Sequence, residues 1–106
     1  MGVKERVETV RKALGCNVHN TEYPKFYELY KSVYLCSSEC GGVGCHVDVT
    51  IHVYKANGRI KVYVNGWTEE ELQKLLDDPK YGVDVACAAC MKDYIETLMN
   101  QIYENL

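Results

Sequence analysis

The chain has 106 residues and a mass of 12.1 kDa, which is the size of one domain and too small for two separate hydrophobic cores. Hydrophobic residues make up 47% and charged residues 25%, a composition that excludes an intrinsically disordered chain. The net charge of -3 argues against general nucleic-acid binding, and no stretch reaches the ~20 apolar residues of a membrane span. Because no signal peptide is evident either, we expect a soluble, cytoplasmic protein without a membrane partner.

Two helices are predicted in the first third of the chain. The first ends before Gly15, a typical C-terminal stop, and the second runs from about Pro24 to Leu35, since proline suits the first helical position. The apolar stripes that define them are Val3, Val7, Val10 and Leu14, and then Phe26, Leu29, Tyr30 and Val33. Cys16 is expected to be a small buried residue.

From Val47 to Val64 the hydrophobic period changes from 3.6 residues to two, which predicts a β-hairpin. Asn57-Gly58 favours a two-residue type I′ turn, and that turn would pair Val53 with Val62. It would likewise pair Ile51 with Val64.

Alternation along the hairpin predicts one buried face and one polar face. The predicted buried face consists of Val47, Val49, Ile51, Val53, Ile60, Val62 and Val64. The predicted polar face consists of His46, Asp48, Thr50, His52, Tyr54, Lys61, Tyr63 and Asn65. Within it, His52, Tyr54, Lys61 and Tyr63 are the candidate binding surface, although a merely solvated face is the simpler interpretation.

Two further helices are predicted after the hairpin. Thr68-Glu69-Glu70-Glu71 forms a capping box, and Asp78-Pro79 ends the helix that it starts. The last helix is predicted from about Asp84 to Tyr103. The predicted fold is therefore a single α+β domain over residues 1–106. It has two N-terminal helices, a Cys-rich loop, a central antiparallel hairpin and two C-terminal helices packed on one sheet face.

Five of the six cysteines fall into two clusters, which suggests a metal site, disulfides or redox chemistry. Cys40 and Cys45 flank a glycine-rich turn before the hairpin, and Cys87 and Cys90 form a Cys-x-x-Cys at a helix start. A loop pair, a hairpin and a Cys-x-x-Cys on a helix resemble the treble-clef arrangement of structural zinc sites. The resemblance implies that these four thiolates hold zinc, with Cys36 and His46 as alternate ligands.

Three alternatives to zinc stay open. The stretch from Cys40 to Leu76 is similar to the end of thioredoxin-like [2Fe-2S] ferredoxins, which implies an iron-sulfur cluster. The six cysteines could instead form structural disulfides without a cofactor, as in a protein of a hyperthermophile or its virus. Cys87 and Cys90 could also serve a thiol-disulfide oxidoreductase.

The sequence favours a non-enzymatic module over an enzyme, because it contains no phosphate-binding glycine loop, HExxH or GxSxG motif. We expect a small binding or regulatory protein that is stabilised by zinc and acts through protein-protein interaction. Nucleic acid is the less favoured partner, and a homodimer by strand addition at the hairpin edge stays open.

Overall fold

The computed structural model describes residues 2–35, 46–78 and 85–106. In these ranges the chain forms helices and one four-stranded antiparallel sheet with strand order β1-β2-β3-β4. The elements in chain order are α1 (Val3–Leu14), β1 (His19–Glu22), β2 (Phe26–Tyr34), β3 (His46–Tyr54), β4 (Ile60–Val64), α2 (Glu69–Asp77) and α3 (Val85–Glu104).

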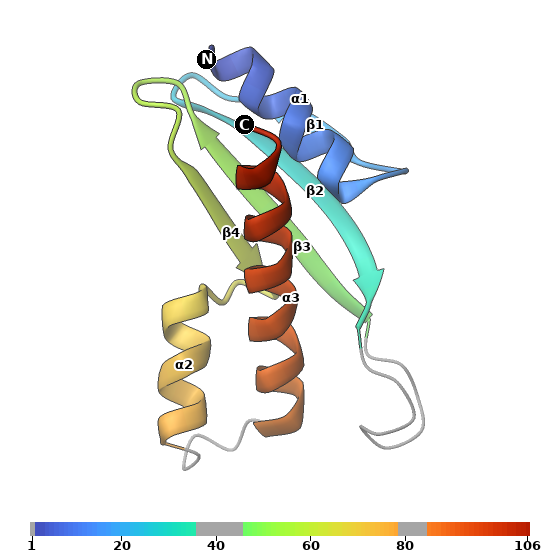
Figure 1. Ribbon diagram of the computed structural model, residues 1–106, viewed down its shortest axis with the longest axis vertical. Helices are drawn as coiled ribbons and strands as arrows, with labels where there is room; N and C mark the ends of the chain where they lie inside the picture. The colour runs from blue at the N-terminus through green and yellow to red at the C-terminus, as the bar shows by residue number, and fades with distance from the viewer. Residues whose placement is uncertain (1, 36–45, 79–84) are drawn as a thin grey trace.

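The helices and the sheet form two layers (Figure 1). α1 and α3 pack on the same face of the sheet, and α2 lies beside the first half of α3. The core between the layers includes Leu29 and Ile51 from the central strands, Val10 from α1 and Ile95 from α3, all of them buried. The opposite face of the sheet carries no helix among the described residues.

The predicted second helix is wrong, because residues 26–34 form β2 at the centre of the sheet. Pro24 does not start a helix. It lies in the tight turn after β1, where the Tyr23 amide donates to the Phe26 carbonyl at 2.8 Å. Leu29 satisfies both a helical and an alternating pattern, but the many aromatic residues around it fit a pleated strand better. The fold therefore has one helix, not two, before the sheet.

Lys31 explains why the alternation in β2 is hard to see in the sequence. Its position belongs to the core face, yet its Nζ atom donates to the Leu14 carbonyl at 2.6 Å. That carbonyl lies at the C-terminal end of α1, where a positive charge interacts favourably with the helix dipole. β1 was not predicted at all, because His19–Glu22 are exposed throughout and show no apolar period.

The hairpin of β3 and β4 is present, but its predicted register is wrong by two residues. Val53 pairs with Ile60 rather than Val62, and Ile51 pairs with Val62. The connection between the two strands spans residues 55–59, and in it the Asn57 side chain accepts a hydrogen bond from the Arg59 amide at 2.9 Å. A shift of two residues preserves which side chains face the core, so the predicted buried face is confirmed.

A second Asn-Gly pair forms the two-residue turn that was assigned to Asn57-Gly58. Asn65 and Gly66 both have positive φ angles, 51° and 80°, as a type I′ turn requires. Around them, Val64 and Trp67 exchange two backbone hydrogen bonds of 2.9 Å. The two-residue Asn-Gly turn of this structure therefore lies between β4 and α2.

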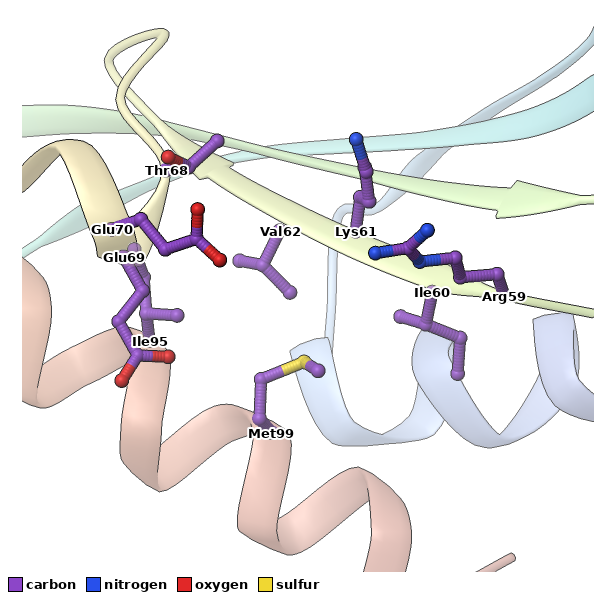
Figure 2. A pocket seen from close by; sticks show the side chains of 9 residues that line it. All are labelled: Arg59, Ile60, Lys61, Val62, Thr68, Glu69, Glu70, Ile95 and Met99. Carbon is purple, nitrogen blue, oxygen red and sulfur yellow. The ribbon is translucent and has the colours of Figure 1, made fainter.

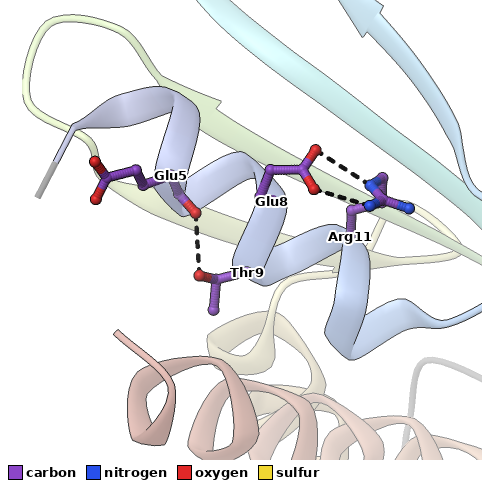
Figure 3. A network of polar contacts seen from close by, with 4 residues as sticks. All are labelled: Glu5, Glu8, Thr9 and Arg11. Atoms are coloured by element: carbon purple, nitrogen blue, oxygen red, sulfur yellow. Dashed lines mark hydrogen bonds and ion pairs between the residues drawn. The ribbon is translucent and has the colours of Figure 1, made fainter.

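The remaining helices agree with the sequence. α1 ends at Leu14 with Gly15 in a positive-φ conformation, and its outer surface carries a Glu8–Arg11 ion pair of 2.8 Å (Figure 3). The capping box at the start of α2 is confirmed, with the Thr68 side chain accepting from the Glu71 amide. In the described ranges, no helix has the length and apolarity needed to cross a bilayer.

Candidate functional site

The candidate site is the side of the sheet opposite the helices, which we call the open face. Antiparallel pairing aligns alternate residues of all four strands there. The open face consists of His19, Thr21, Phe26, Glu28, Tyr30, Ser32, Tyr34, His46, Asp48, Thr50, His52, Tyr54, Lys61 and Tyr63. Tyr34 is 77% exposed at one end of it.

An aromatic cluster lies at the end of the open face nearest the turn before β2. The Phe26 and His52 ring centroids are 4.4 Å apart, and the Phe26 and Tyr54 centroids are 5.8 Å apart. His52 also lies 5.2 Å from the Tyr63 ring, and Tyr23 packs on Phe26 at 5.0 Å. All of these pairs are tilted, which is a favourable geometry for aromatic contacts and gives the cluster a defined shape.

Ionisable groups surround this cluster. His52 Nε2 lies 3.5 Å from a Glu28 carboxylate oxygen across the β2–β3 pair. Burial raises the pKa of Tyr63, and the neighbouring Tyr54 hydroxyl raises it further, so the Tyr63 phenol stays protonated near neutral pH. Lys61 stands directly opposite His52 on β4. The predicted binding residues His52, Tyr54, Lys61 and Tyr63 are therefore neighbours on one surface.

Asp48 is the centre of a polar network at the other end of the open face. Its Oδ1 atom accepts hydrogen bonds from the Tyr30 hydroxyl at 2.8 Å and from the Ser32 hydroxyl at 2.9 Å. These two hydrogen bonds lower the pKa of Asp48, while partial desolvation opposes them. Nearby, the rings of Tyr34 and His46 lie 4.9 Å apart. The carboxylate fixes the orientation of two hydroxyl groups on β2.

We expect the pH titration of Asp48 to report this network. Because the folded-state pKa is lowered, the stabilisation is present above the unfolded-state pKa and is lost as the pH falls through the folded-state pKa. The double variant Tyr30→Phe, Ser32→Ala should raise the pKa of Asp48 toward the usual aspartate value of about 3.9. NMR titration of the Asp48 carboxyl carbon measures this shift. Tyr54→Phe is the control, and an unchanged Asp48 titration in the double variant would contradict the network.

Comparison with known proteins gives no relative. No family model, no curated protein and no solved structure matches this chain. Functional inference therefore depends on the chemistry of the described residues alone.

The predicted zinc ligands fall mostly outside the described residues. Cys36, Cys40 and Cys45 lie in the segment 36–45, and the structure does not describe the side chain of Cys87. Cys90 is partly buried in α3, and His46, the alternate ligand, lies exposed on the open face beside Tyr34. Within the described ranges, no three His, Cys, Asp or Glu side chains form a group suited to a metal.

One cavity is lined both by a residue next to the first cysteine cluster and by a member of the second. Leu35, which directly precedes Cys36, and Cys90 line the same cavity of about 280 Å³, together with Tyr94. The end of β2 therefore lies next to the beginning of α3. Cys16 is exposed, contrary to the expected burial, because it follows the end of α1 in a surface turn.

Sequence reasoning missed the contribution of β2 to the site. The side chains of Phe26, Glu28, Tyr30 and Tyr34 were assigned to a helix, so their position beside β3 could not be foreseen. The signal in the sequence was that Phe26, Tyr30 and Tyr34 are separated by even numbers of residues. A strand places residues with this separation on one face.

Proposed function

We propose that the protein is a small non-enzymatic interaction module that binds a protein partner through its open face. The supporting observation is the cluster of Phe26, His52, Tyr54 and Tyr63 on the side of the sheet that no described helix covers. Tyrosine and phenylalanine are enriched at the centres of protein interfaces, where they bury a large area at low cost in side-chain entropy.

The charges of the open face favour a protein over a nucleic acid. Sheet faces rich in aromatic residues also bind single-stranded nucleic acids, but phosphate neutralisation requires several cations along the surface. Here Lys61 is accompanied by the carboxylates Glu28 and Asp48, and the lowered pKa of Asp48 keeps its charge negative. Mixed charges around an aromatic centre suit a polar interface rim.

A structural zinc site is the second part of the proposal. Cys40, Cys45, Cys87 and Cys90 would hold the ion, with Cys36 and His46 as alternate ligands. The cavity shared by Leu35 and Cys90 supports it, because residues that adjoin both cysteine clusters are close in space. A zinc ion would supply a rigid cross-link between the β2–β3 connection and α3. A disulfide framework, an iron-sulfur cluster or a redox-active Cys87–Cys90 pair are the alternatives.

Site-specific photocrosslinking tests the binding surface. A photoreactive phenylalanine analogue replaces Tyr34 on the open face, or Tyr103 on α3, which is 52% exposed and serves as the matched control. In cells that express the protein, the Tyr34 position should give a discrete adduct that the Tyr103 position does not give. Mass spectrometry identifies the adduct, and the purified partner is then titrated by calorimetry.

The titration decides the proposal. His52→Ala and Tyr63→Ala should each weaken binding about ten-fold or more, and Tyr103→Ala should leave it unchanged. Equal losses in all three variants would overturn the proposal, as would tighter binding of a single-stranded oligonucleotide than of any protein. A discrete adduct with a second copy of the chain, together with a dimer in sedimentation analysis, would identify the partner as the protein itself.

A further inference from the structure

A groove runs along the outer edge of β4, and Lys61 is the one open-face residue among the described residues that line it. Its volume is about 250 Å³, and its floor is formed by Ile60 and Val62 of β4 with Ile95 and Met99 of α3 (Figure 2). The first turn of α2 closes one end of the groove. β4 has β3 as its neighbour on one side, and α2 packs against α3 rather than along β4.

Backbone groups on this edge are available for pairing. Val64 exchanges hydrogen bonds with Trp67, so its amide and carbonyl point away from β3. In an antiparallel ladder the direction alternates from residue to residue, and Ile60 and Val62 therefore point their amides and carbonyls the same way as Val64, away from β3. No described strand pairs with that side of these two residues. The antiparallel bridge between Val64 and Trp67 already begins a strand on this edge.

The two ends of the groove have opposite charges. Figure 2 shows Arg59 and Lys61 along β4 and Glu70 at the start of α2, with the apolar floor between them. Glu69 is partly buried, so Glu70 is the exposed carboxylate of the groove lining at that end. A second copy of β4 fits this pattern poorly, because antiparallel pairing through Ile60 and Val62 would place Lys61 opposite Lys61.

We propose that the groove binds an extended peptide of another protein as a fifth strand, antiparallel to β4. Its two apolar side chains pair with Val62 and Ile60 and cover the floor beside Met99. Its acidic side chains stand opposite Lys61 and Arg59, and a basic residue at its N-terminal end lies near Glu70. Backbone hydrogen bonds supply affinity in this mode of recognition, and the alternate side chains supply specificity.

NMR titration with two synthetic peptides tests the groove. The first is acetyl-Lys-Val-Glu-Val-Glu-amide, and the second is its charge-swapped counterpart, acetyl-Glu-Val-Lys-Val-Lys-amide. The first should shift the amide signals of Ile60 and Val62 and the methyl signal of Met99, while Tyr34 on the open face stays unchanged. The charge-swapped peptide should bind about five-fold more weakly or worse.

Two variants separate backbone pairing from charge. Val62→Pro removes the amide N–H that points away from β3 and leaves the hydrogen bonds between β4 and β3 in place. Val62→Ala is its control for the lost side-chain volume. The proline variant should bind the first peptide about ten-fold more weakly than the alanine variant. Arg59→Glu alters an exposed side chain, leaves the core intact, and should shift the preference toward the charge-swapped peptide.

Several results would overturn the groove proposal. They are the absence of shifts at millimolar peptide, equal binding of the two peptides, equal binding by Val62→Pro and Val62→Ala, and shifts confined to the open face. His52→Ala, which tests the open face, should leave the binding of the first peptide unchanged. The two proposals can therefore fail independently.

Discussion

Leu29→Ala is expected to lower the free energy of unfolding by about 3 kcal/mol, which corresponds to a fall in melting temperature of about 10 °C or more for a domain of this size. Leu29 is fully buried on β2, and β2 has strands on both sides. Its removal leaves a cavity in the layer where α1 and α3 meet the sheet. Chemical denaturation monitored by circular dichroism measures the loss.

Tyr34→Ala is the matched control for this prediction, because it truncates a residue of the same strand whose side chain is largely exposed. It should change the free energy of unfolding by less than about 0.5 kcal/mol. Equal losses for Leu29→Ala and Tyr34→Ala would mean that β2 is not the central strand of the core.

Cys90→Ser is expected to abolish zinc binding and to destabilise the protein by about 3 kcal/mol or more, if the proposed site is present, because metal-binding energy contributes directly to folding. The wild-type protein should carry one zinc ion in native mass spectrometry and should lose stability when a strong chelator removes it. Cys87→Ser should behave in the same way, since both thiolates belong to the proposed tetrahedral set.

Cys16→Ser is the control for the zinc experiment, because Cys16 is exposed and lies after α1. It should retain both zinc and stability. Purified protein without metal, in which cysteines other than Cys16 resist alkylation after denaturation until a reductant is added, would favour disulfides. Inorganic sulfide and a visible absorption band would favour an iron-sulfur cluster.

Local signals in the sequence predicted some elements well. α1, the capping box of α2 and the buried face of the hairpin follow from apolar spacing and from capping chemistry that involves residues close in sequence. β2 could not be assigned in this way, because Leu29 fits both periods and Lys31 occupies a core-facing position. The contact that makes Lys31 acceptable there is with the end of α1, which is distant in sequence.

The choice between two Asn-Gly pairs shows a second limit. Both Asn57-Gly58 and Asn65-Gly66 carry the signal for a two-residue turn, and only the strand pairing decides which one adopts it. Prediction of the candidate site was limited in the same way, because it also depended on strand pairing. Alternation within β3 and β4 predicted His52, Tyr54, Lys61 and Tyr63 as neighbours, but the half of the open face on β2 depended on recognising that strand.

The two faces of the sheet give this small domain two nearly separate sets of positions for evolutionary change. In β2 and β3 the even-numbered residues lie on the open face, and the odd-numbered residues face the helices. If the open face binds a partner as proposed, substitutions at even-numbered positions alter the binding preference while the packing that maintains the fold stays the same. A lineage could therefore acquire new partners through this surface without first accumulating compensating changes in the core.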